Sequence, residues 1–119
     1  KNKEYDTPDD AKGVRFSINS IEADRLKISP QNIYINKKAF SETLHYLKKN
    51  RHDRSNKIEI RSSDDPAMAG PLCTTARDHN GNIRCINYIL PILFKNNIVG
   101  IDGNRPNKTW IISCGEADA

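Results

Sequence analysis

The segment Asn82-Ile-Arg-Cys-Ile-Asn-Tyr-Ile-Leu-Pro-Ile-Leu-Phe-Lys-Asn96 carries the most informative pattern in the chain. At 100° per residue its apolar side chains fall on one side, formed by Ile86, Ile89, Leu90 and Leu93. The opposite side is polar and holds Arg84, Asn87, Tyr88 and Lys95. Pro91 also falls on this polar side, where the loss of one backbone hydrogen bond predicts a kink. The pattern therefore predicts a helix over Asn82–Asn96 with one face buried and the other exposed.

Two strand-like runs follow this helix, Ile98-Val-Gly-Ile101 and Thr109-Trp-Ile-Ile112. The residues between them, 102–107, include Asp, Gly, Asn and Pro, which favour turns. We therefore expect a hairpin over Val99–Ser113 with a basic tip, and we expect Trp110 to pack in the core beneath the preceding helix.

Three further elements precede the segment. Gly70-Pro71 is a typical helix start and predicts a short helix over Pro71–Asp78. Residues 57–61 alternate like a strand, and Lys37–Asn50 has helical apolar spacing after a candidate N-cap, Asn36. The lysines at 37, 38, 48 and 49 are expected to form a solvated face. Earlier still, residues 14–35 contain short alternating runs that predict half-buried strands.

The order of helix, strand, helix, helix and hairpin over residues 36–113 resembles the winged helix-turn-helix family. This resemblance implies an α+β fold, a winged helix with three helices and a small antiparallel sheet that ends in a β-hairpin wing. Short N-terminal strands precede it. We divide the chain into a linker or disordered segment (1–13), an N-terminal β extension (14–35), the winged-helix domain (36–113) and a tail (114–119).

The resemblance implies double-stranded DNA as the partner, with the helix 82–96 in the major groove and the wing 99–113 on the backbone or in the minor groove. Arginine can pair with guanine and asparagine with adenine, so the side chains expected to contact bases are Asn82, Arg84, Asn87 and Tyr88. Those expected on the DNA backbone or at the wing are Thr74, Thr75, Arg77, Lys95, Arg105 and Lys108.

Composition bounds these expectations. The chain has 119 residues, which suits one domain, and a formal net charge of +4, which fits a phosphate-binding surface. No apolar run approaches the roughly 20 residues of a membrane span. Three cysteines in no dense pattern favour a reducing compartment, so we expect a cytoplasmic, nucleoid-associated protein without a membrane partner. Since the chain begins at Lys1 rather than Met, we expect a domain of a longer protein.

We expect no cofactor, metal or catalytic residue. Cys73-x5-His79-x5-Cys85 matches no common zinc motif and lacks an evident fourth ligand. A nuclease reading of Asp64 and Asp65 with Glu59 would need a lysine two positions after the acid, where Arg61 stands.

Three functional interpretations stay open. The first is DNA binding within a transcription regulator or a replication protein. The second is target recognition within a restriction endonuclease, including one that reads modified DNA. The third is a winged-helix module for protein–protein interaction. A homodimer is compatible with each of them.

Overall fold

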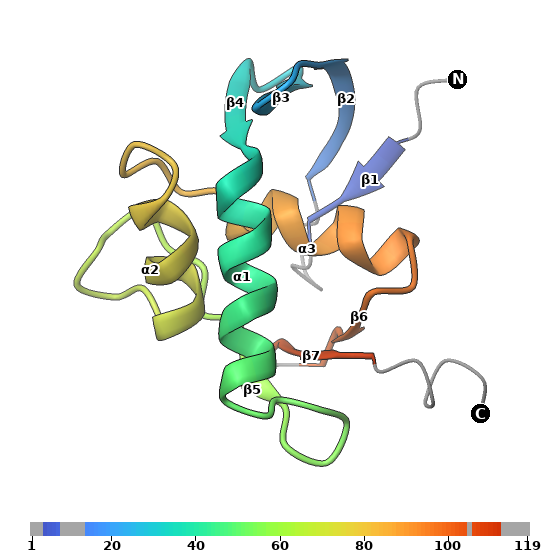
Figure 1. The fold of residues 1–119 in the computed structure, drawn as a ribbon, viewed down its shortest axis with the longest axis vertical. Helices are drawn as coiled ribbons and strands as arrows, with labels where there is room; N and C mark the ends of the chain where they lie inside the picture. Colours follow the sequence, from blue (N-terminus) through green and yellow to red (C-terminus); the bar gives the residue numbers. More distant parts are fainter. Residues whose placement is uncertain (1–3, 8–13, 105, 113–119) are drawn as a thin grey trace.

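The computed structural model describes residues 4–7, 14–104 and 106–112, and these form an α+β fold with antiparallel sheets (Figure 1). In chain order the elements are β1 Glu4–Asp6, β2 Arg15–Ile21, β3 Arg25–Ser29, β4 Ile33–Asn36, α1 Lys37–Lys49, β5 Ile58–Glu59, α2 Pro71–Asp78, α3 Ile86–Lys95, β6 Val99–Asp102 and β7 Lys108–Ile111.

The N-terminal strands form a four-stranded antiparallel meander in the order β1-β2-β3-β4. Alternation along the strands places the fully buried side chains Phe16, Ile28 and Ile35 on one face, in agreement with the half-buried strands that the sequence pattern predicts. The expected linker differs from the structure at Glu4–Asp6, because this segment is strand β1 and pairs with β2. Its central side chain, Tyr5, is buried and stacks on Phe16 with ring centroids 5.3 Å apart.

The second sheet has the order β5-β7-β6, and β6 and β7 form the hairpin expected from the turn residues between them. The expectation that Trp110 packs in the core is wrong. Its neighbour Thr109 is fully buried, so alternation places Trp110 on the outer face of the sheet. There the indole lies across Gly100, its cross-strand partner, so closely that a Cβ at this position would overlap the ring.

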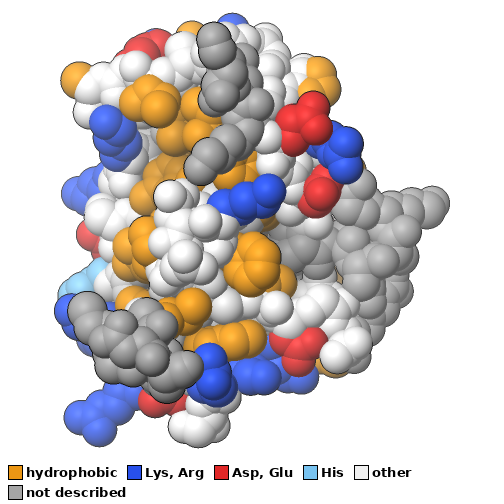
Figure 2. Space-filling model, turned by 90° about the vertical axis from the view of Figure 1, so that its right-hand side faces the viewer, with side chains coloured by type: hydrophobic (Ala, Val, Ile, Leu, Met, Phe, Trp, Pro, Cys, Tyr) orange, Lys and Arg blue, Asp and Glu red, His pale blue; other side chains and the backbone are white. Residues whose placement is uncertain are grey.

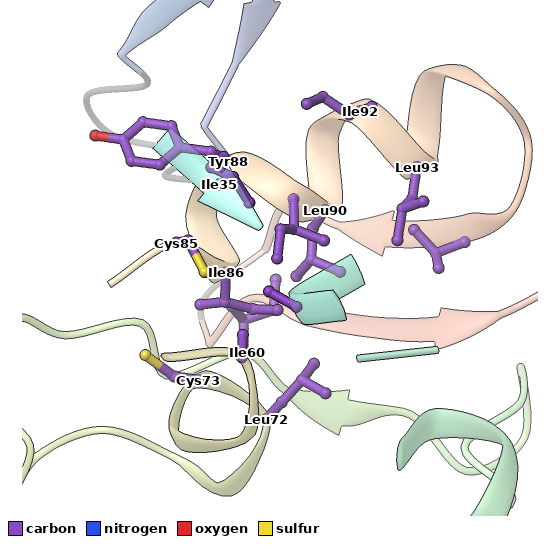
Figure 3. Packing of buried hydrophobic residues seen from close by; sticks show 14 of the residues in the cluster. Ile35, Ile60, Leu72, Cys73, Cys85, Ile86, Tyr88, Leu90, Ile92 and Leu93 are labelled. Carbon is purple, nitrogen blue, oxygen red and sulfur yellow. The ribbon is translucent and has the colours of Figure 1, made fainter. Parts of the chain in front are cut away.

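Helix α3 begins at Ile86, four residues later than expected, and eight of its ten residues, Ile86 to Leu93, are buried. The predicted exposure of Pro91 is therefore wrong. The cause is a second packing partner: the Tyr88 ring meets Phe16 of β2 edge-on, with centroids 5.2 Å apart. In Figure 3 Tyr88 points toward the N-terminal strands, whereas Ile86 points toward α2. The N-terminal sheet thus covers the face of α3 that the sequence pattern leaves exposed.

A buried asparagine joins the N-terminal sheet to the turn between α2 and α3. The side-chain oxygen of Asn80 accepts a hydrogen bond from the Asn36 N–H (2.7 Å), and its amide nitrogen donates to the Tyr34 carbonyl (3.3 Å). β4 is an edge strand, so the Asn80 amide satisfies backbone groups that a further strand would otherwise pair. Residues 14–35 are therefore packed into the same core as the helices rather than appended to it.

Candidate nucleic-acid interface

The four side chains expected to contact bases do not form one exposed surface. Asn82 is exposed and Arg84 is half-buried, but Asn87 and Tyr88 are only 8% and 7% exposed. The predicted reading face is therefore wrong for these last two residues. The spacing of apolar residues along one helix contains no information about packing against a distant part of the chain. Here the N-terminal sheet covers the face of α3 that would have to contact the DNA.

Arg77 and Arg84 are both engaged within the protein. Arg77 is 3% exposed and donates to the Ser63 carbonyl (2.8 Å), so the expectation that it contacts the DNA backbone is wrong. Its guanidinium instead holds the loop that precedes α2. The Arg84 Nε lies 3.0 Å from an Asp64 carboxylate oxygen, which neutralises its charge locally.

The remaining predicted contacts are scattered. Thr74 and Thr75 are half-buried, and the Thr75 hydroxyl donates to the Pro71 carbonyl (2.9 Å). Lys95 is exposed at the end of α3. Lys108 is half-buried and lies between two acidic cross-strand neighbours, Glu59 and Asp102. The expected wing residue Arg105 lies outside the described residues.

Positive charge instead concentrates on α1 and the loop after it. Residues 37–57 hold seven lysines and arginines against two carboxylates, a formal charge of +5, so the rest of the chain carries a net charge of −1. All seven cationic side chains are exposed. We call this surface the basic ridge, and its members are Lys37, Lys38, Lys48, Lys49, Arg51, Arg54 and Lys57.

The geometry of α1 gathers the four lysines of the ridge. At 100° per residue they fall within an arc of about 120°, opposite the buried residues Ala39, Thr43 and Leu47. Among the described residues, no ridge cation lies within 4.0 Å of a carboxylate oxygen, whereas the observed ion pairs involve Arg15, Arg25 and Arg84. The ridge therefore presents positive charge that the described part of the protein does not pair.

The loop carboxylate Asp53 is turned into its own backbone. It accepts hydrogen bonds from the Ser55 hydroxyl (2.8 Å) and from the Ser55 N–H (2.9 Å). These bonds lower the pKa of Asp53, so it stays ionised while being held in a local turn. It does not bridge to Arg51 or Arg54.

Three ridge cations occupy positions where folding alone favours other residues. Lys37 and Lys38 lie in the first turn of α1, which contains no acidic residue, and there they face the positive end of the helix dipole. Arg51 adopts φ +56° directly after the helix C-cap. The N–H of His52 bonds to the Leu47 carbonyl (2.9 Å), which makes this a Schellman ending whose left-handed position usually holds glycine.

The exposure of the four α1 lysines agrees with the expected solvated face, and the structure adds Arg51, Arg54 and Lys57 to the same charged region. The sequence alone contains a signal of the basic ridge, because the net charge of residues 37–57, +5, exceeds that of the whole chain, +4. The paired lysines at the start of a predicted helix were a second signal.

The described residues show no group of three or more histidine, cysteine or acidic side chains that could hold a metal ion. Cys73 and Cys85 are both buried free thiols. Burial is the main cause that raises the pKa of Cys85 to about 12, with the neighbouring Cys73 contributing in the same direction. Cys85 therefore stays protonated at neutral pH, which suits a core side chain and not a nucleophile or metal ligand.

Within the described part of the chain, no helix has the length and apolar character needed to cross a bilayer. No protein-family model matches the sequence, and neither the curated proteins nor the solved structures include a significant match.

Proposed function

We propose that this chain binds double-stranded DNA by holding the phosphate backbone on the basic ridge, without inserting α3 into the major groove. The element order α1-β5-α2-α3-β6-β7 agrees with the winged-helix resemblance and supports that architecture as part of the proposal. The helix that would enter the groove is covered by the N-terminal sheet, so the contact surface moves to α1.

The observation that carries the proposal is the placement of Lys37, Lys38 and Arg51. A solvated face needs charge, but it does not need cations at a helix N-terminus or at a left-handed position that glycine would fill with less strain. Phosphate binding gives these cations a role. Helix α1 is about 20 Å long, and B-DNA carries one negative charge per roughly 1.7 Å of axis, so the ridge can meet several phosphates at once.

Fluorescence anisotropy with a labelled duplex tests the proposal over a series of salt concentrations. With about four to six phosphates neutralised, log affinity should fall against log salt with a slope near −4 to −5. A triple variant, Lys38→Ala, Lys49→Ala and Arg54→Ala, should reduce the magnitude of the slope by about 3. No binding by the wild-type protein at low salt would overturn the proposal.

A matched control removes the same formal charge away from the ridge, by Arg15→Ala, Lys27→Ala and Arg84→Ala. This variant should keep the wild-type slope, because these side chains lie on the N-terminal sheet or before α3. Equal losses in the two triple variants would mean that net charge, and not the ridge, attracts the duplex.

Phosphate contacts fix position but carry no direct sequence information. The ridge alone should therefore bind unrelated duplexes with affinities within about threefold of each other. This expectation fits a positioning role within a transcription regulator or a replication protein. A strong preference for one sequence would mean that side chains outside the ridge contact bases, as target recognition in a restriction endonuclease or a site-specific transcription regulator requires.

A further inference from the structure

A pocket of about 290 Å³ opens where β1, the C-terminal turn of α3 and the β6 hairpin strand meet. This side of the molecule faces the viewer in Figure 2, which shows hydrophobic side chains across it and cationic side chains along its left and lower margins. The residues that line the pocket are Asp6, Pro91, Phe94, Lys95, Ile101 and Gly103.

The walls combine apolar surface with two opposite charges. Pro91 and Ile101 contribute apolar area, and Phe94 is 48% exposed despite its size. The Asp6 carboxylate is 60% exposed, and one of its oxygens lies 3.3 Å from the Arg15 Nε. Lys95 is exposed, with its Nζ 5.9 Å from the centre of the Tyr5 ring. The lining is mostly apolar, and Asp6 and Lys95 are the two charged residues among the six, so a ligand with a flat apolar ring and a polar edge matches it better than a purely aliphatic one.

We propose that this pocket takes a nucleobase, stacked on Phe94, with its polar edge directed to Asp6 and Lys95. A base is a planar ring that stacks on aromatic side chains, and its edge carries both donors for a carboxylate and acceptors for an ammonium group. The volume lies at the small end of ligand pockets, which suits one ring system and not a larger molecule.

The base can come from two sources. One is a free nucleotide. The other is a base extruded from a duplex that is bound on the basic ridge, and this source rests on the proposed function. Extrusion requires unstacking, which is least unfavourable for an unpaired or mismatched base. A duplex with one mismatch is therefore the sensitive probe.

The first experiment is a titration of the isotope-labelled full chain with dCMP and dAMP, followed by two-dimensional NMR. Saturable shifts at Phe94, Lys95, Ile101 and Gly103 are expected. Ribose 5-phosphate, which lacks a base, should leave these signals unchanged. Phe94→Ala should raise the dissociation constant about tenfold. The matched control, Ile21→Ala, removes another exposed apolar side chain (67% exposed) and should bind like the wild type.

The second experiment compares a mismatched duplex with a fully paired one. A preference for the mismatch that Phe94→Ala abolishes identifies an extruded base, whereas nucleotide binding without this preference identifies the free nucleotide. The ridge triple variant should still bind dCMP, so loss of duplex binding does not affect the nucleotide titration. Absence of shifts with both nucleotides, or equal shifts with ribose 5-phosphate, would overturn the proposal.

Discussion

Helices α1 and α3 differ in how much of their surface the rest of the chain covers. In α3, eight of ten residues are buried, while in α1 only three of thirteen are. Helix α3 packs against α2 on one side and against the N-terminal sheet on the other, as the contact between Tyr88 and Phe16 shows. Helix α1 exposes four lysines to solvent. The difference teaches that the helix available to a partner is set by what the rest of the chain covers.

Phe16→Ala should have the largest effect on this comparison. Phe16 is 1% exposed and joins Tyr5 to Tyr88, so its truncation leaves a cavity between the sheet and α3. The free energy of unfolding should fall by about 3–5 kcal/mol, measured by urea denaturation. The exposed Ile21→Ala should change it by less than about 0.5 kcal/mol. A small effect of Phe16→Ala would mean that the sheet is a dispensable extension after all.

Asn80→Ala should have the next largest effect. It removes the acceptor for the Asn36 N–H and a donor to the Tyr34 carbonyl at a site that is 4% exposed. Leaving such groups unpaired should lower the free energy of unfolding by about 2–3 kcal/mol. Hydrogen exchange at Asn36 checks the local cause, because its amide should lose protection more than the amides within α1. Unchanged protection there would contradict the assigned bond.

The sequence pattern predicts correctly the helices and the hairpin whose formation depends on residues close by in the chain. Helix Pro71–Asp78 follows from Gly70-Pro71, and the hairpin follows from the turn residues between its strands. Helix Lys37–Lys49 follows from its apolar spacing. Pattern failed where a distant segment decides burial, as for Tyr88 and for strand β1.

Two failures nevertheless had a signal in the sequence. The run from Ile86 to Phe94 contains one polar side chain, Asn87, together with Tyr88, and a helix that is apolar all round is typically buried. The glycine opposite Trp110 was a weaker signal, because a strand glycine often marks the close approach of another group. The basic ridge is hidden in the net charge of the whole chain, +4, and becomes visible when the +5 of residues 37–57 is counted by itself.

Arg51→Gly should separate stability from binding. Glycine adopts the left-handed conformation without a Cβ penalty, so the free energy of unfolding should rise by about 0.5–1 kcal/mol. The slope of log affinity against log salt for duplex binding should fall in magnitude by about 0.9, the contribution of one phosphate contact. Asn97→Gly is the control, because Asn97 has φ +61° at the equivalent position after α3 but lies outside the ridge. It should leave the slope unchanged. A stable Arg51→Gly with wild-type binding would remove Arg51 from the interface.

Arg84→Ala should have the smallest effect on stability and on duplex binding, although the winged-helix resemblance implies that Arg84 contacts a base. Its partner Asp64 is largely exposed, and such pairs contribute about 0–1 kcal/mol, so the stability should change by less than about 0.5 kcal/mol. Duplex affinity should change less than about twofold, since Arg84 is outside the ridge and paired.

Asp64→Ala sharpens this test, because it frees the Arg84 guanidinium without removing it. If α3 is excluded from the groove by the N-terminal sheet, the freed side chain has no base to reach, and binding should show only the small gain expected from one lost negative charge. That gain should be equal for unrelated sequences. A gain in affinity confined to one sequence, and lost again in the double variant Asp64→Ala and Arg84→Ala, would show that Arg84 contacts a base. The segment before α3 would then belong to the DNA-contacting surface together with α1.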